Sequence, residues 1–136
     1  MTSVFFYGLF MDKTLLEEKG FHPTTPILAV LNDYALEIGD RATLMKMTGR
    51  CVYGTVMQLA QEEIDTLYGG QSVADYLPED VVITTFEKEK QNVVVYNLPM
   101  DKVAGPNHQY AQRLVQVASE VGLPEEYLKE IELFTR

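Results

Sequence analysis

Cysteine is almost absent from this sequence, since Cys51 is the only one among 136 residues. One thiol cannot form a disulfide within the chain, nor can it build a cysteine-based metal cluster. Cys51 lies in an expected strand, where a lone cysteine is more often a small core residue than a nucleophile. We therefore expect no thiol catalysis, no metal centre and no cofactor.

Positive charge is also scarce, because 11 Lys and Arg residues stand against 20 Asp and Glu, which gives a net charge of −9. Nucleic-acid binding needs clustered Lys and Arg, so nucleic acid is not an expected partner. A small anion stays possible if a local arginine or a set of backbone N–H groups outweighs the overall negative field.

Long hydrophobic runs are missing as well. No apolar stretch approaches the ~20 residues that span a bilayer, so no membrane partner is expected. The apolar N-terminus has no basic region before it and meets Asp12 and Lys13 at once, unlike a signal peptide. The expected location is therefore the cytoplasm.

What is present is the composition of a globular protein, with 46% hydrophobic and 23% charged residues. A chain of this length can form one domain that buries roughly two thirds of its surface. We find no internal repeat and no domain boundary, so we expect a single domain over residues 1–136. The sequence leaves the oligomeric state open.

Strands joined by short turns dominate the first part of the chain. The expected strands cover residues 4–7, 27–38, 42–47, 51–59, 81–86 and 93–98. A bend or a bulge is expected at Asn32 and Asp33, and a turn at residues 48–50. Gly54, inside a strand, indicates a bulge or a close approach of two backbones.

The element order predicts the fold class. Two short helices, at residues 11–19 and 61–68, do not give the regular βαβ alternation of a doubly wound sheet. Short turns favour a mixed or antiparallel sheet that curls into a barrel. We therefore expect an α+β fold, a small twisted β-barrel over about residues 3–98 that is flanked by helices.

A helical segment is expected to complete the fold at about residues 107–133. Asn107 can cap a helix over residues 108–121, whose apolar residues keep helical spacing. Gly122 ends that helix, and Pro124 is placed to open another as its first residue.

The turn at Tyr7 and Gly8 is a first candidate for a ligand site. An apolar strand ends there and a helical segment follows, an arrangement that can present backbone N–H groups to a bound group. Gly8 would let the chain approach a ligand closely and take φ values closed to other residues. The alternative is that the strand is merely core and Gly8 merely a turn.

Several stretches carry a resemblance when they are taken together. They are Phe6-Tyr7-Gly8-Leu9, Asp33-Tyr34-Ala35-Leu36, residues 52–59 (VYGTVMQL), the acidic helix that follows, and Tyr76 before a hairpin that ends Val95-Tyr96. In this order they resemble the gamma-glutamylcyclotransferase-like superfamily, which includes the plant avirulence-induced-gene-like proteins. The resemblance covers roughly residues 3–97.

The resemblance implies a barrel with a cavity in which the Tyr-Gly turn donates main-chain N–H groups to a substrate carboxylate. It places Tyr7, Gly8, Leu9 and Phe10 at that cavity, although many relatives carry Ser or Thr and a polar neighbour where Leu9 and Phe10 stand. In that superfamily a glutamate is the general acid/base. The α-amine attacks the γ-carbonyl, which forms 5-oxoproline and releases the other amine. One carboxyl group can serve both proton transfers, typically for ~10²–10⁴ in rate.

The glutamate that the resemblance requires is missing from this chain. In the superfamily it belongs to a Leu-Asp-x-x-Glu-Gly run. Aligned on Leu67, its position is Gln71, and aligned on Asp65, its position is Tyr68. A glutamine amide does not titrate, and a tyrosine with a pKa of about 10 would need a large depression to act as a base.

Other residues near this run could take part in a site. Asp75 could replace the glutamate as acid/base, or it could be a turn residue bonded to nearby backbone. Arg41 could reach an anionic ligand or lie on the surface. Tyr76 and Tyr96 could line the same end of the barrel as Tyr7, or Tyr96 could be core. We expect Glu79 to be solvated.

Two functions stay open. The first is a gamma-glutamylcyclotransferase-like protein whose cavity takes a small amine- or carboxylate-bearing compound and could cleave gamma-glutamyl amides to 5-oxoproline. The second is a non-catalytic small-molecule-binding or interaction domain that kept the fold and lost the acid. Whether the protein is an enzyme is left undecided by the sequence.

Overall fold

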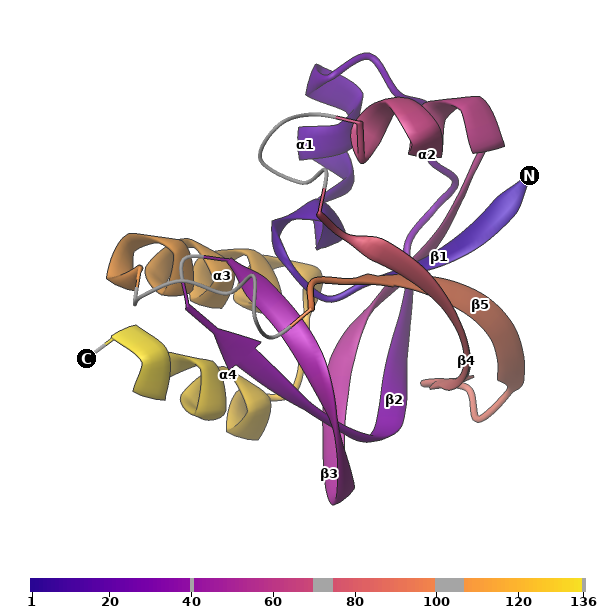
Figure 1. The fold of residues 1–136 in the computed structure, drawn as a ribbon. Helices are drawn as coiled ribbons and strands as arrows, with labels where there is room; N and C mark the ends of the chain where they lie inside the picture. The colour runs from indigo at the N-terminus through magenta and orange to yellow at the C-terminus, as the bar shows by residue number, and fades with distance from the viewer. Residues whose placement is uncertain (40, 70–74, 100–106, 136) are drawn as a thin grey trace.

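The structure is a computed structural model that describes residues 1–39, 41–69, 75–99 and 107–135 (Figure 1). Gln71, one of the candidate positions for the superfamily glutamate, lies outside the described residues. The elements are, in chain order, β1 (Thr2–Phe6), η1 (Leu9–Met11), α1 (Lys13–Glu18), β2 (Ile27–Ile38), β3 (Ala42–Leu59), α2 (Gln61–Leu67), β4 (Leu77–Thr85), β5 (Lys90–Asn97), α3 (His108–Val121), α4 (Glu125–Glu132) and η3 (Leu133–Thr135).

The five strands close into a barrel in the order β1-β3-β2-β4-β5. Every neighbouring pair is antiparallel except β1 and β5, which are parallel and meet at Val4 and Val94. This parallel contact between the first and last strands closes the barrel. The predicted α+β fold with a mixed barrel and a C-terminal helical segment is confirmed.

The core follows the alternation of strand side chains, which point by turns to the two faces of a sheet. In β4, Val81, Ile83 and Thr85 are buried, and in β5, Val93 and Val95 are buried, while their neighbours are more exposed. All three C-terminal residues of β1 are buried, because this strand is covered on both faces.

The predicted turn at residues 48–50 is wrong, because β3 runs through it as one strand of 18 residues. The predicted bulge in β2 explains how β3 continues through these residues without reversing direction. Between Asn32 and Tyr34 the register with β3 shifts, and Asp33 has a φ of 64°. Gly49, with a φ of 86°, donates its backbone N–H to Asp33 Oδ1 at 3.1 Å. Gly49 therefore belongs to an irregular stretch of the ladder rather than to a chain reversal.

The hairpin of β4 and β5 is longer than its apolar residues predict. β4 already starts at Leu77 and β5 at Lys90, so both strands include polar residues. Lys90 pairs with Thr84, and Asn97 pairs with Leu77. Backbone pairing continues through exposed polar side chains, which hydrophobic patterning does not register.

The C-terminal helices follow their local signals. α3 has the predicted bounds, and the Asn107 side chain accepts a hydrogen bond from the Tyr110 N–H at 3.0 Å. Gly122 ends this helix with a φ of 91°. Pro124 caps α4 from outside rather than being its first residue. Figure 1 shows α3 and α4 side by side next to the barrel. No described helix is both long and apolar enough to cross a membrane.

Gly54 is confirmed as a point of close backbone approach. A Cβ at this position would lie 2.2 Å from the Phe6 carbonyl oxygen and 3.0 Å from the Phe5 ring. The Phe6 carbonyl belongs to the strand paired with β3, so it cannot move aside without disturbing the ladder. The absence of a side chain at Gly54 therefore lets β1 take its place against β3.

Replacing Gly54 with alanine should destabilise the protein by about 3 kcal/mol or more, because the added methyl group meets backbone rather than a movable side chain. Urea unfolding followed by circular dichroism measures this. Gly20→Ala is the control, since a Cβ there has nothing within 4 Å and only a φ of 91° opposes it. A Gly54→Ala cost no larger than the Gly20→Ala cost would contradict the packing described above.

Candidate functional site

A cavity of about 400 Å³ lies where the end of β1, η1, α1, the start of β3 and α3 come together. Its lining is mostly aromatic: Phe5, Phe6, Tyr7, Gly8, Leu9, Phe10, Leu15, Lys19, Arg41, Ala42, Tyr68, Tyr76, Tyr96, Tyr110 and Arg113. The structure thus gathers at one cavity the residues predicted to bind a ligand, which are Tyr7, Gly8, Leu9, Phe10, Arg41, Tyr76 and Tyr96. Their role in binding stays a prediction.

Gly8 is required for a reason other than an unusual φ. Its φ is −107° and its ψ is −152°, which is extended backbone, so the expectation of a φ closed to other residues is wrong. A Cβ at Gly8 would lie 2.8 Å from the Tyr110 hydroxyl oxygen. Gly8 therefore leaves room for Tyr110, which approaches from α3.

Tyr110 is a cavity residue that the sequence did not single out as part of the site. Burial raises its pKa to about 12, and the Leu9 backbone amide and the charge of Arg113 oppose this rise only in part. Tyr110 is thus neutral at physiological pH, and its hydroxyl lies beside the turn predicted to hold a carboxylate. Tyr110 falls on the apolar face of α3, so the helical spacing predicted only that it packs against the core.

Tyr7 fastens the end of β1 to β5. Its hydroxyl donates to the Tyr96 carbonyl oxygen at 2.7 Å and lies 3.2 Å from Asn97 Oδ1. Burial raises the pKa of Tyr7 well above its usual value, and the neighbouring tyrosines add to the rise. Tyr7 therefore acts here as a neutral hydrogen-bond donor that positions the wall of the cavity.

Glu79 supports this wall from behind, and the expectation that it is solvated is wrong. Its half-buried carboxylate accepts from the Tyr34 hydroxyl at 2.9 Å and from Asn97 Nδ2 at 3.0 Å. Because Glu79 takes the amide nitrogen of Asn97, the amide oxygen faces Tyr7. Glu79 is not among the residues that line the cavity. It therefore acts on the cavity indirectly, through Asn97. The residues next to Glu79 in sequence give no indication of this role.

Tyr68, which takes the glutamate position when the run is aligned on Asp65, is part of the aromatic wall. Its ring stacks on Tyr96 with a centroid distance of 4.0 Å and an interplanar angle of 9°. Phe10 meets it edge-on at 6.0 Å, and Tyr76 lies tilted at 6.0 Å. Burial raises the pKa of Tyr68 well above its usual value, the opposite of what a general base would need.

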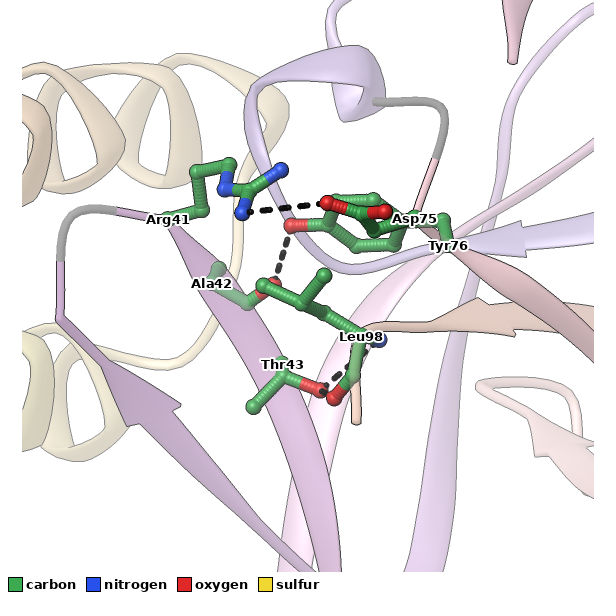
Figure 2. A network of polar contacts seen from close by, with 6 residues as sticks. All are labelled: Arg41, Ala42, Thr43, Asp75, Tyr76 and Leu98. Atoms are coloured by element: carbon green, nitrogen blue, oxygen red, sulfur yellow. Dashed lines mark hydrogen bonds and ion pairs between the residues drawn. The ribbon is translucent and has the colours of Figure 1, made fainter. Parts of the chain in front are cut away.

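Arg41 and Asp75 form an ion pair at the edge of the cavity. The guanidinium Nη2 lies 3.8 Å from Asp75 Oδ2, and Figure 2 shows the two charged groups facing each other. The Arg41 side chain is 22% exposed and that of Asp75 is 49% exposed. Arg41 lines the cavity whereas Asp75 does not. The predicted acid is therefore next to the site but outside its lining.

Hydrogen bonds fix the start of β3, which directly follows Arg41. The Tyr76 hydroxyl donates to the Ala42 carbonyl oxygen. Thr43 Oγ1 donates to the Leu98 carbonyl oxygen at 2.5 Å and accepts from the Leu98 N–H at 3.0 Å (Figure 2). These bonds hold the start of β3 to the chain that follows β5, so the position of Arg41 is set by residues far away in sequence.

The charge at the cavity is opposite to that of the protein. Among the described residues that line it, the charged groups are Lys19, Arg41 and Arg113, and none is a carboxylate. No three described His, Cys, Asp or Glu residues are grouped so that they could hold a metal ion. Such a lining can attract an anion and surround it with aromatic rings, but it offers no carboxyl group for proton transfer.

Comparisons with known proteins agree with this fold. A family model described as "AIG2-like family" matches residues 51–131, which is more than half of the chain. A solved gamma-glutamyl cyclotransferase has a TM-score of 0.82 at 22% identity, over 96% of this chain and 86% of that one. An uncharacterized protein from Homo sapiens has a TM-score of 0.80 at 22% identity, with the same coverage. A protein from Arabidopsis thaliana has a TM-score of 0.64 at 19% identity, over 91% of this chain and 95% of that one. No curated protein sequence matches significantly.

Alkaline pH should destabilise the protein through its tyrosines. The pKa of Tyr110 is raised from 10.0 to about 12, so the folded state holds this proton more tightly than the unfolded chain does. The resulting stability is complete below about pH 10 and is lost as pH rises towards about 12, on the order of 2 kcal/mol for this residue.

Urea unfolding followed by circular dichroism, at several pH values from about 8 to about 11.5, measures this loss; the chain has no tryptophan to serve as a fluorescent probe. Tyr110→Phe should show a shallower decline because it has no phenol to titrate. Equal slopes in the variant and the parent protein would contradict the raised pKa of Tyr110.

Gly8→Ala should destabilise the protein by about 1–2 kcal/mol, since its methyl group would meet the Tyr110 hydroxyl. Adding Tyr110→Phe removes that oxygen and should restore most of the loss. A double-mutant cycle, with each free energy of unfolding measured in urea, isolates the coupling. Strictly additive costs would show that Gly8 and Tyr110 do not compete for this space.

Proposed function

The chain belongs to the AIG2-like family and has the gamma-glutamylcyclotransferase-like fold, and on this premise we propose that its cavity binds a small carboxylate- or amine-bearing compound without catalysing the reaction that depends on a glutamate. A volume of about 400 Å³ suits a small molecule. Apolar walls with a few polar groups are typical of such sites.

The observation that carries this proposal is the lack of a carboxylate among the described lining residues. Release of 5-oxoproline from a gamma-glutamyl amide needs a group that takes a proton from the α-amine and returns it to the leaving amine. The tyrosines that approach the cavity are poor candidates, because burial raises the pKa of Tyr7, Tyr68 and Tyr110. An amide at Gln71 would not titrate either.

A second candidate is catalysis by Asp75, and its ion pair with Arg41 favours it. Arg41 lines the cavity, so the carboxylate paired with it at 3.8 Å is within a short side-chain movement of the rim. In this role Asp75 would accept the proton of the attacking α-amine and pass it to the departing amine. The products would be 5-oxoproline and a free amine.

A binding screen and a turnover assay together test the two candidates. A thermal-shift screen should find a stabilising ligand among amino acids, gamma-glutamyl compounds and small carboxylates, since a ligand at 100 times its Kd adds ~2.7 kcal/mol. Incubation with glutathione and gamma-glutamyl amino acids, with detection of 5-oxoproline, should give no product.

Asp75→Asn distinguishes the outcomes, with Asp80→Asn as its control because Asp80 is an exposed acid on β4. Turnover that disappears in Asp75→Asn but persists in Asp80→Asn would establish the second candidate. Turnover that survives both changes would defeat both candidates. A screen in which no compound stabilises the protein would remove the proposed binding function.

A further inference from the structure

The charges around the cavity come from three separate elements. Lys19 follows α1, Arg41 immediately precedes β3, and Arg113 lies in α3, yet all three line the same space. This convergence occurs in a chain whose net charge is −9. Arg113 also lowers the pKa of Tyr110, so its charge is felt inside the cavity and not only in solvent. The local field at this site therefore favours a negative group.

Arg41 is the best placed of the three to contact that group. Its side chain is only 22% exposed, so the surrounding solvent screens its charge less than it screens a fully exposed one. Its partner Asp75 lies at 3.8 Å, near the outer limit of an ion pair, and is 49% exposed. A guanidinium has five N–H donors, so it can hold a ligand carboxylate as well as Asp75.

The walls of the cavity favour a flat apolar body next to the negative group. Tyr68 and Tyr96 form a parallel stack at 4.0 Å, while Phe10 meets Tyr68 at an interplanar angle of 81°. Aromatic rings pair favourably in offset-stacked and edge-to-face arrangements. A further ring inside the cavity can join the cluster by either geometry, where an aliphatic chain would gain only apolar contact.

Resting on the function proposed above, we infer that the cavity selects a carboxylate that carries an aromatic ring and no ammonium group, in preference to an α-amino acid. An ammonium group at this site would face Lys19, Arg41 and Arg113, and the described lining residues include no carboxylate to offset them. Asp75 lies outside that lining, and its carboxylate is already paired with Arg41. Lys19 and Arg113 are exposed, so solvent screens part of their repulsion, whereas Arg41 is only 22% exposed and repels a second positive charge more strongly. The same three side chains attract a carboxylate.

Isothermal titration calorimetry with four matched probes tests this inference on the full chain. Phenylpropionate has both the ring and the carboxylate, phenylalanine adds an α-ammonium group, phenylpropanol removes the charge, and propionate removes the ring. Phenylpropionate should bind about tenfold or more tightly than each of the other three. Added salt should weaken its binding, because the attraction to the cations is electrostatic.

Single variants assign the two parts of the recognition. Arg113→Gln should weaken phenylpropionate binding about threefold to tenfold, whereas Lys129→Gln, an exposed change on α4 away from the cavity, should not. Tyr68→Leu should reduce the advantage of phenylpropionate over propionate. Circular dichroism shows whether each variant is folded before its binding is compared.

The outcomes separate this inference from the proposed function. If phenylalanine or a gamma-glutamyl amino acid binds as tightly as phenylpropionate, the selection against ammonium is overturned, and the proposed binding function stands. If propionate binds as tightly, the aromatic preference is overturned. If neither the four probes nor the compounds of the thermal-shift screen bind, both the inference and the proposed function fail.

Discussion

The fixed end of β1 is the constraint on which the site depends. Gly54 has no side chain, so the Phe6 carbonyl can lie against β3, while the Tyr7 hydroxyl bonds to the Tyr96 carbonyl on β5. The strand is thus held from both sides at the point where it leaves the barrel. Gly8 and the residues after it consequently enter the cavity from a defined direction, and Tyr110 can approach them closely.

Two kinds of polar group surround the cavity, and each has a different effect on it. Neutral hydroxyls set the geometry, because burial keeps Tyr7 and Tyr110 protonated while they pack against backbone. Charge comes instead from Lys19, Arg41 and Arg113. The overall acidity of the chain and the basic character of this cavity coexist, since net charge reflects the whole surface whereas a ligand responds to the few groups around it.

Local signals predicted the local parts of the structure. Asn107 and Gly122 delimit α3 because capping depends on residues within one turn. The bulge at Asp33 and the close approach at Gly54 could also be predicted from the sequence, because Asn32 and Asp33 interrupt an apolar strand pattern and glycine has no side chain.

The parts that sequence reasoning missed depend on residues far apart in the chain. Nothing in the residues next to Glu79 in sequence marks it as more than a surface charge. Its hydrogen-bond partners are Tyr34, 45 residues earlier, and Asn97, 18 residues later, and they hold it half-buried. Tyr110 faces Gly8 because α3 packs against η1. The continuity of β3 through Gly49 likewise depends on its pairing with β2.

The length of β3 brings both of its ends to the wall of the cavity, since Phe5 and Phe6 line the cavity and pair with Val56 and Thr55. Its first residue, Ala42, borders the cavity, and its last residues, Thr55 to Leu59, pair with β1. Local opening of a ladder starts at its ends, where amide hydrogens exchange with solvent most readily. A molecule held against Ala42 would restrain that end of the ladder, so slower amide exchange at the start of β3 would report occupancy of the cavity.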